Sequence, residues 1–381
     1  TWGQVGNSQI SGRRFAYLAT VTDSSSTSYT FGKNMDQNYG TTAIDEYAVD
    51  VTWEVADKTD IGVDMRLLNN KLNLQFDYFK ESREGIYLRR SSIPSYVGMI
   101  NNPYGNIGKV ENKGFELSVN YANSWGGDWS LSLMGNYSFN RNKVLEDDST
   151  VVYPWQNTIG NKVGQRFGLV ALGLFENYGE IAASPVQTGD TRPGDIKYKD
   201  INGDGKIDEY DKVPIGWGSV PEIMYGFGFS VGWKNLSLTA MFQGAAHVDA
   251  MLSGEGVLPF SQGSSRGNLL SNITDRWTEE NPRQNAFYPR LSIGNINMNY
   301  EESTWWLKDT DYLRLKNIEL SYRLPDHWMK RIHLDNARIF IQGVNLLTFS
   351  SFKIWDEELG DGRGARYPNI ASVSLGVNFN F

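Results

Sequence analysis

The sequence predicts an all-β fold, a transmembrane antiparallel β-barrel with long extracellular loops. Three observations lead to it: apolar and polar residues alternate over segments of about ten residues, the segments come in pairs joined by tight turns, and long connections alternate with the tight ones. Because successive side chains of a strand point to opposite faces, each segment has an apolar face and a polar face. A membrane barrel needs this arrangement, since one face meets lipid and the other meets a wet lumen.

The alternating segments can be followed in chain order. The pairs are 61–67 with 72–78, 115–121 with 129–139, and 223–233 with 236–242. Further strands are expected at about 312–324, 336–346 and 371–381, and a tenth at Arg14–Thr22. This gives nine or ten strands, which we expect to be the C-terminal part of a larger barrel.

The last segment has the clearest alternation. Ala371, Val373, Leu375, Val377, Phe379 and Phe381 alternate with Ser372, Ser374, Gly376, Asn378 and Asn380. An aromatic residue at Phe381 is expected at the membrane interface. The alternation resembles the signal read by barrel-assembly machinery, so we expect Phe381 to be needed for assembly.

Composition limits the alternatives. A net charge of -8 argues against nucleic acid as a partner, and the absence of cysteine excludes disulfides and thiolate metal sites. The sequence contains no run of about 18 apolar residues, which a transmembrane helix would require. A soluble β-sandwich or barrel would also alternate, but its polar face is usually charged. Here that face is rich in Gly, Ser, Asn and Gln, and the apolar face has Trp, Tyr and Phe near both ends.

Loop lengths predict the orientation. The connections at 68–71, 124–128 and 233–235 are tight, as periplasmic turns are, whereas the long connections at about 82–112, 141–222, 245–311 and 348–368 are expected outside the cell. The 325–335 connection must then be periplasmic. We expect 141–222 to form a lid, and 167–175 to be part of it because a lone spanning strand would break the alternation of directions.

Four stretches carry a family resemblance: 104–116 (YGNIGKVENKGFE), 194–208 (GDIKYKDINGDGKID), 312–322 (YLRLKNIELSY) and 343–348 (GVNLLT). With them the chain resembles the C-terminal part of a SusC/RagA-type TonB-dependent outer-membrane transporter. The resemblance implies a barrel of about 22 strands with a plugged lumen. It also implies the outer membrane of a Gram-negative, Bacteroidota-like bacterium and a SusD-like lipoprotein that delivers glycans or peptides.

The resemblance also implies parts that this sequence does not contain. They are a plug domain, the TonB-contacting segment and roughly half of the barrel. An open sheet in lipid would leave unpaired backbone groups that each cost several kcal/mol. We therefore expect the remainder to come from an N-terminal portion or another chain.

A calcium loop is the strongest local motif. Oxygen ligands occur at positions 1, 3, 5, 9 and 12 of the loop 200–211, with a backbone carbonyl at position 7. The expected Ca²⁺ ligands are Asp200, Asn202, Asp204, Lys206 (by its carbonyl), Asp208 and Asp211. Gly205 would supply the sharp turn, and Pro214 downstream argues against an EF-hand with two helices. The alternative is an acidic turn without metal, held by Asx hydrogen bonds.

Aromatic residues in the loops are candidates for contact with a ligand or partner: Trp155, Trp217, Trp305, Trp306 and Trp355, together with Tyr153, Trp277, Tyr312 and Tyr367. They could stack on sugar rings or on a peptide. For any single residue we favour the other explanation, packing within the loops or a flat contact with a lid protein.

These features predict a transport protein of the outer membrane rather than an enzyme. His247, His327 and His333 have no Ser/Asp pattern nearby that would suggest nucleophilic catalysis. Two alternatives remain: a calcium-stiffened binding or structural protein of the cell surface, and a passive porin, which would need neither plug nor TonB.

Overall fold

The computed structural model describes residues 1–7, 15–33, 37–97, 99, 101–260, 269–294, 296–331 and 334–380. The chain divides into two compact units. The first comprises Thr1–Ile61, Phe79–Lys113 and Arg141–Val163, and the second comprises Gly62–Tyr78, Gly114–Asn140 and Gly164–Phe381. None of the helices in the described ranges is long and apolar enough to cross a membrane.

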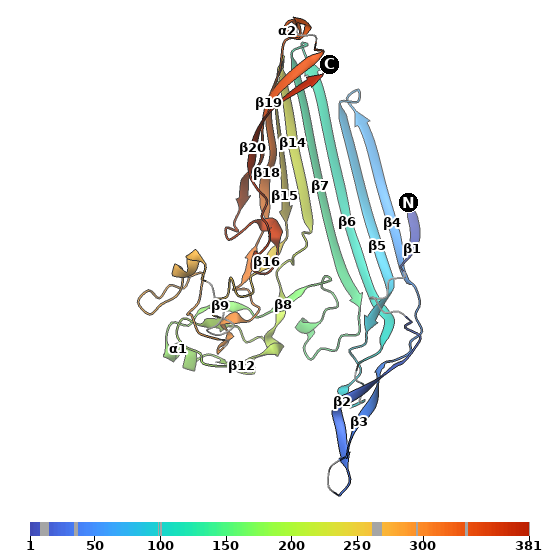
Figure 1. Ribbon diagram of the computed structural model, residues 1–381, viewed down its shortest axis with the longest axis vertical. Helices are drawn as coiled ribbons and strands as arrows, with labels where there is room; N and C mark the ends of the chain where they lie inside the picture. The colour runs from blue at the N-terminus through green and yellow to red at the C-terminus, as the bar shows by residue number, and fades with distance from the viewer. Residues whose placement is uncertain are drawn as a thin grey trace. The chain divides into compact units, whose positions relative to one another are not determined.

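Ten strands form one antiparallel sheet in the order β1-β4-β5-β6-β7-β14-β15-β18-β19-β20 (Figure 1). The order begins and ends on different strands, so the sheet does not close on itself, as expected for part of a larger barrel. The strands are β1 (Trp2–Asn7), β4 (Glu54–Leu67), β5 (Leu72–Arg89), β6 (Tyr104–Trp125), β7 (Trp129–Glu146), β14 (Ile223–Trp233), β15 (Leu236–Ala246), β18 (Tyr312–Arg323), β19 (Asn336–Ser350) and β20 (Ser372–Asn380).

The pairing register of neighbouring strands confirms the apolar face and the polar face that the alternation predicts. Phe229 on β14 lies opposite Leu133 on β7 and Ala240 on β15, so apolar residues form one continuous row across the strands. The same face continues to β20, where Val377 and Leu375 lie opposite Ile339 and Ile341 on β19. Because each expected pair is found as a hairpin or a neighbouring strand, the main strand predictions are confirmed.

The tenth strand was assigned wrongly. Residues 15–19 are not in a strand, and Thr20–Phe31 (β2) pairs instead with Gln37–Glu46 (β3) in a separate two-stranded sheet. The tenth strand of the large sheet is β1, which pairs with β4 from Trp2 opposite Thr59 to Asn7 opposite Glu54. With Gly3 and Gly6 among its six residues, β1 shows little alternation, which is why the pattern does not reveal it.

Aromatic rings form two rows on the apolar face. In the first, Phe115 packs against Phe76 and Phe139, with ring centroids 6.2 and 5.9 Å apart. In the second, Trp129 and Trp233 lie 6.0 Å apart beside the tight turns. The ten residue-to-residue steps from Phe115 to Trp125 cover about 33 Å of strand, or about 25 Å of height when the strand is tilted by about 40°. This is the height of the apolar band of an outer-membrane barrel.

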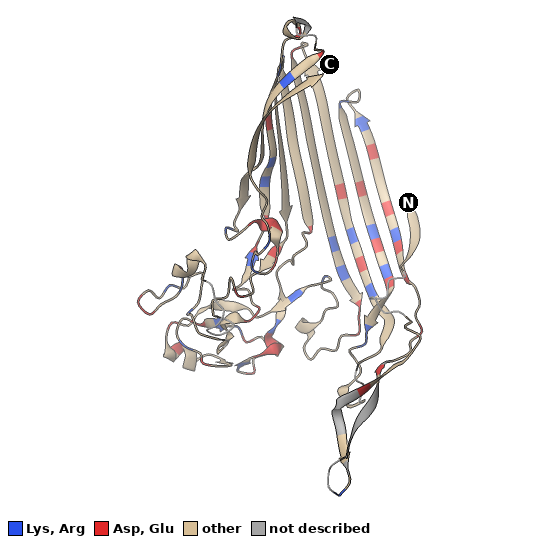
Figure 2. Cartoon of the chain, viewed as in Figure 1, with Lys and Arg blue, Asp and Glu red and all other residues tan. Residues whose placement is uncertain are grey.

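On the long strands β5 and β6, Figure 2 shows most of the charged residues toward one end of the strand. These strands are longer than the alternation predicts: β5 has 18 residues and β6 has 22, against about 10 that a membrane span requires. Strands β14 and β15, which are described throughout, contain no charged residue.

The remaining elements are short. Between β18 and β19 lies the helix α2 (Asp326–Arg331), within the long turn expected at 325–335. Short strands are β8 (Arg166–Gly168), β9 (Ala171–Leu174), β10 (Val186–Gln187), β11 (Ile196–Tyr198), β12 (Lys206–Ile207), β13 (Val213–Ile215), β16 (Asp249–Met251) and β17 (Leu307–Asp309). The helix α1 is Tyr178–Ala182, and single 3-10 turns occur at Ser95–Val97, Pro154–Gln156, Glu209–Asp211, Ser271–Thr274, Met298–Tyr300 and Glu357–Leu359. Arg14, His333 and Phe381 lie outside the described residues.

Candidate functional site

Three long connections of the second unit fold together into one body. We call it the loop body; it comprises the described parts of 164–222, 247–311 and 351–371. Backbone hydrogen bonds join the connections: Leu169 N–H donates to Glu302 O at 2.9 Å, and Gly362 N–H donates to Met251 O at 2.9 Å. Strands β8 and β9 lie here and not in the large sheet, as expected for 167–175.

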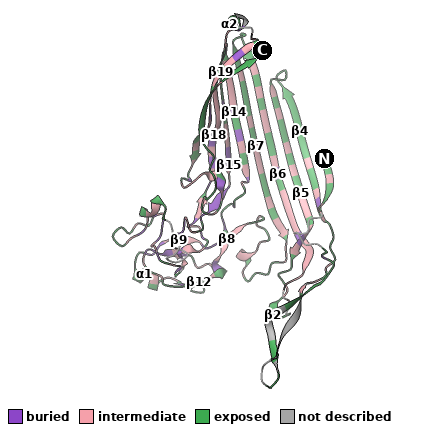
Figure 3. Cartoon of the chain, viewed as in Figure 1, coloured by how far each residue is buried: buried purple, intermediate pink, exposed green. Residues whose placement is uncertain are grey.

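The loop body has its own hydrophobic core, which Figure 3 shows as the concentration of buried residues around β9 and β16. Trp306 is 1% exposed at its centre, and its indole Nε1 donates to Asn299 O at 2.7 Å. Other members come from all three connections: Leu169, Leu174, Ile196, Tyr198, Ile207, Met251, Leu252, Val257, Trp277, Tyr288 and Phe352. Because the three connections share one core, they form a single packed structure and not three independent loops.

Asp195 anchors two of the connections to each other. Its side chain is buried, and the guanidinium of Arg290 donates to both of its oxygens at 2.9 Å. Asn299 Nδ2 and Asn297 Nδ2 donate to Oδ1 at 2.8 and 3.2 Å, and the backbone N–H of Arg192 donates to Oδ2 at 2.8 Å. This site was not predicted from the sequence, because its side-chain partners Arg290, Asn297 and Asn299 are about a hundred residues away along the chain and no local spacing marks them.

A second buried carboxylate, Asp249 on β16, joins β8 to the turn before β14. It pairs with Arg166 and accepts hydrogen bonds from the backbone N–H groups of Trp217 and Gly218. The same Arg166 donates to Asp361 Oδ1 at 2.5 Å. One guanidinium therefore holds segments from all three connections.

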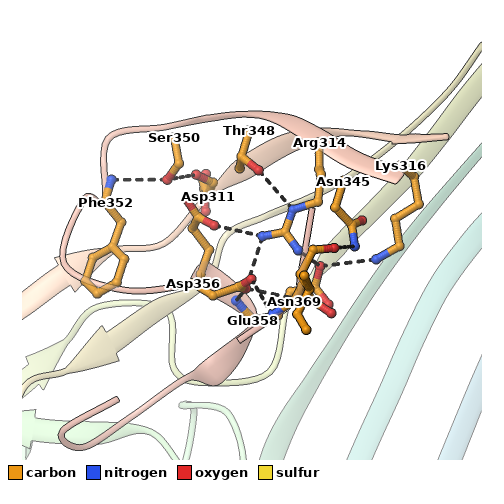
Figure 4. Close-up of polar contacts among 12 residues, drawn as sticks. Asp311, Arg314, Lys316, Asn345, Thr348, Ser350, Phe352, Asp356, Glu358 and Asn369 are labelled. Atoms are coloured by element: carbon orange, nitrogen blue, oxygen red, sulfur yellow. Dashed lines mark hydrogen bonds and ion pairs between the residues drawn. The ribbon is translucent and has the colours of Figure 1, made fainter. Parts of the chain in front are cut away.

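Arg314 fixes the last connection to β18 (Figure 4). Its side chain is 3% exposed, and it donates to Asp356, Glu357 and Glu358 at 3.0, 2.9 and 2.8 Å and to Thr348 Oγ1 at 3.0 Å. Burial raises the pKa of Asp356, but hydrogen bonds from Glu358 N–H and Arg314 outweigh it, and the pKa lies below its ordinary value. The carboxylate of Asp356 is therefore charged at neutral pH.

The acidic loop 200–211 is closed by its own hydrogen bonds. Asp200 accepts from the N–H groups of Gly203 and Gly205 at 2.7 and 2.9 Å. Asp211, which is fully buried, accepts from Ile201 N–H at 2.7 Å and Asp208 N–H at 2.9 Å. Gly203 and Gly205 both have positive φ, as expected at the sharp turn.

These bonds shape the loop without showing a metal centre. Asp204 and Asn202 bond to each other, since Asp204 N–H donates to Asn202 Oδ1 at 3.0 Å and Asn202 Nδ2 donates to Asp204 Oδ2 at 3.1 Å. Lys206 N–H donates to Asp204 Oδ1 at 2.9 Å. In the part of the chain that the structure describes, no group of three or more His, Cys, Asp or Glu side chains is placed to hold a metal ion. The donor chemistry fits Ca²⁺, and its binding stays a prediction.

A cavity of about 300 Å³ opens beside this loop. Leu169, Ile207 and Met298 are among its apolar lining residues, and Asp208 and Glu301 are among its charged ones. Asp208 therefore belongs both to the expected metal ligands and to the wall of the cavity.

The five candidate tryptophans have different local surroundings. Trp155, in the first unit, stacks on Tyr153 with centroids 4.6 Å apart, and Trp217 in the second unit stacks on His247 at 3.9 Å and is 42% exposed. Trp306 is buried in the loop core, so its side chain serves packing. Trp305 and Trp355 are half-buried: the Nε1 of Trp305 donates to Phe287 O at 3.2 Å, and Trp355 packs on Phe352.

Comparison with known proteins matches residues 18–346 to the family model described as TonB dependent receptor-like, beta-barrel. The TonB-dependent receptor P3 of Formosa agariphila is 28% identical over 377 residues, which cover 91% of this chain and 36% of that protein. The TonB-dependent receptor SusC of Bacteroides thetaiotaomicron is 24% identical, covering all of this chain and 37% of SusC. The chain thus spans little more than a third of these relatives.

Among solved structures, that of the RagAB peptide transporter aligns with a TM-score of 0.69 at 21% sequence identity, covering all of this chain and 40% of the matched chain. At that identity the likeness shows the fold. It agrees with the ten-stranded antiparallel sheet. TonB-dependent receptors and SusC homologues are outer-membrane proteins of Bacteroidota-type Gram-negative bacteria. The chain belongs to the TonB-dependent receptor-like β-barrel family and resembles the C-terminal part of its SusC-like members.

Proposed function

We propose that this chain forms the C-terminal part of the barrel of a nutrient importer. The importer takes up oligosaccharides or peptides across the outer membrane, energised by TonB, together with a SusD-like surface lipoprotein. The observation that carries the proposal is the family match over residues 18–346. The plug and the TonB-contacting segment would come from an N-terminal portion of the same protein or from another chain.

The loop body supports this proposal over a passive pore. A pore needs only short constrictions, whereas these connections build a body with its own core and three arginine-centred networks, around Arg166, Arg290 and Arg314. Such a rigid surface suits contact with a partner protein, because a preorganised surface loses little entropy on binding.

Trp217 is the candidate residue for partner or ligand contact. Its indole is 42% exposed and lies flat against His247, at 3.9 Å and an angle of 3°. His247 in turn contacts Glu222 at 3.2 Å through Nδ1. A large aromatic ring held in place by its neighbours is the side chain most often important in protein interfaces, and it also stacks on sugars.

Growth experiments test the substrate class. A strain without the full-length protein should fail to grow on one class of nutrient, oligosaccharides or peptides, and should recover when the protein is restored. The Trp217→Ala variant should lower uptake at limiting ligand, whereas Trp328→Ala, an exposed tryptophan on α2, should not. Unchanged growth of the deletion strain on both classes would contradict the proposal.

We further propose that loop 200–211 binds one Ca²⁺ and that the ion stiffens the loop body. The expected ligands include four carboxylates and an amide within twelve residues, and the mutual repulsion of the carboxylates disfavours the folded loop unless a cation compensates it. The proposal requires these side chains to turn toward a common centre when the ion binds.

A further inference from the structure

The imidazole of His247 lies between an exposed indole and a buried carboxylate. Its ring stacks on Trp217, with centroids 3.9 Å apart and an angle of 3° between the planes. Its Nδ1 lies 3.2 Å from Glu222 Oε2, and the side chains of His247 and Glu222 are 34% and 7% exposed. His247 therefore connects Trp217, the residue proposed above for ligand or partner contact, to the interior of the loop body.

The backbone around these side chains is held in place as well. Trp217 N–H donates to Asp249 Oδ2, and Glu222 N–H donates to His247 O at 3.4 Å. His247 has a φ of 55°, a left-handed conformation that a residue with a side chain keeps only where its surroundings require it. The segment before β14 and the residue after β15 are thus fixed to each other, and the stacked pair belongs to a defined structure.

Protonation changes both contacts of the imidazole. Histidine is the side chain that ordinarily gains or loses its charge between about pH 5 and 8. A protonated ring has an N–H on each nitrogen, so Nδ1 donates to the Glu222 carboxylate in a charge-assisted hydrogen bond. The charged ring is also attracted to the face of the Trp217 indole, as cations are to aromatic rings. Neither contact has this attraction when the ring is neutral.

Three more carboxylates belong to the segments around His247. Asp249 pairs with Arg166, and Asp309 accepts from the backbone N–H of Asp311 at 2.8 Å. Asp311 accepts from the backbone N–H of the residue that follows His247, at 3.1 Å. Carboxylates ordinarily titrate at about pH 4. Burial raises the pKa of Asp311, so Asp311 is the group that a test must separate from His247.

We propose that His247 is a positioning residue for Trp217: its protonation holds the indole in place, so contact through Trp217 depends on pH. The proposal rests on the function proposed above for Trp217. In the protonated state the indole is preorganised and loses less entropy on binding. In the neutral state the indole moves more freely, and binding through it is weaker.

Fluorescence of a single labelled indole in the full-length protein tests this without any ligand. Trp217 is replaced by 5-hydroxytryptophan, which can be excited apart from the other tryptophans. Time-resolved anisotropy then separates restrained from mobile indole. A cation–π contact at a partly exposed site shifts an equilibrium by about two- to fivefold, so the ratio of restrained to mobile indole should fall by about that factor from pH 5 to pH 8.

Two variants assign the response to the imidazole. His247→Asn tolerates the left-handed backbone but carries no charge, so the indole should be mobile at both pH values. His247→Arg stays charged and should keep the indole restrained at both. The same probe at Trp233, which lies beside Trp129, should not respond to pH.

The proposal is wrong if the ratio in the parent is the same at pH 5 and pH 8. It is also wrong if His247→Asn keeps the response, because Asp311 or another group would then control the indole. Neither result depends on nutrient uptake, so failure here is distinct from failure of the proposed import.

Discussion

Arg314 on β18 donates to Asp356 Oδ1 at 3.0 Å, and this contact connects a strand of the barrel wall to the connection between β19 and β20. Asp356 in turn accepts from the backbone N–H of Asn369 at 3.0 Å through Oδ2. The two ends of the connection are therefore held at one carboxylate, which is itself held by a buried guanidinium. Loss of the guanidinium should release the whole connection.

Replacing Arg314 by Met should destabilise this region strongly. The change leaves Asp356 and Glu357 charged and unpaired in a position where each side chain is 8% exposed, and breaking such a buried pair costs about 3–5 kcal/mol. Hydrogen exchange of residues 351–371 measures the effect. Arg323→Met is the control, because Arg323 is 60% exposed and its pair with Asp326 is worth at most about 1 kcal/mol. Equal exchange in both variants would contradict the role of Arg314.

The same contact predicts a response to acid. Because the pKa of Asp356 in the folded protein lies below its ordinary value of 3.8, its stabilising contribution is complete above about pH 4 and is lost as pH falls through the lower folded pKa. A spin label on Tyr367→Cys, an exposed position in a chain without other cysteines, reports on the connection. The label should be equally restricted at pH 7 and pH 5 and should gain motion only below about pH 4. Gain of motion between pH 7 and pH 5 would show that another group controls the loop.

Calcium should protect the loop body from proteolysis. Chelation should increase cleavage within 164–222, while the ladder of the large sheet stays protected. Asp204→Ala should mimic chelation, whereas Lys206→Ala should do little because only its carbonyl would coordinate the ion. Affinity as weak as about 10⁻⁴–10⁻³ M would suffice outside the cell. A titration that shows no binding in millimolar calcium would leave an acidic turn held by hydrogen bonds.

Replacing Phe229 by Arg should block membrane assembly. Phe229 lies in the apolar row between Leu133 and Ala240, and Arg near the midplane on the lipid face costs about 2–4 kcal/mol. Gly228 faces the lumen, but a side chain there would approach Ala240 O to 2.9 Å. Ser230→Arg is therefore the better control: Ser230 lies on the same lumen face, and its hydroxyl accepts a hydrogen bond from Thr239 Oγ1 at 3.0 Å. Equal assembly of the Phe229 and Ser230 variants would mean that the facing assignment is wrong.

Deletion of Phe381 should lower the amount of folded protein in the outer membrane. The reason is the apolar alternation of β20, where Val373, Leu375, Val377 and Phe379 lie opposite residues of β19. Heat-modified mobility on gels measures the folded fraction. Normal insertion of the deletion variant would show that the terminal residue is dispensable.

The alternation predicted the membrane part of the fold because burial in lipid imposes a period of two on each strand. In this way β14 and the start of β15 were located to the residue, whereas β15 continues to Ala246, four residues past the predicted end. Where the strands extend beyond the membrane, apolar and polar residues no longer have to alternate. Both faces of β5 carry charges there, for example Lys80 on one face and Arg83 on the other, so the sequence did not reveal the extension of β5 to Arg89.

The loop body could be predicted only in part. The sequence indicated a lid at 141–222, whereas residues 141–163 fold with the first unit, and the loop body draws on two later connections as well. The contacts that hold it together include ion pairs such as Arg166 with Asp361 and Asp195 with Arg290. Because the two partners of each pair are far apart along the chain, they leave no local sequence pattern. The acidic loop 200–211 was visible because its spacing is local.

The central claim is that the full-length protein imports a nutrient with energy supplied through TonB. Uptake of a labelled nutrient should be measured in cells that make the full-length protein, with and without TonB, at a ligand concentration too low for diffusion through general pores. The account predicts uptake that is saturable and is lost when TonB is absent. Uptake of equal rate in the strain without TonB would contradict it and would indicate a passive porin.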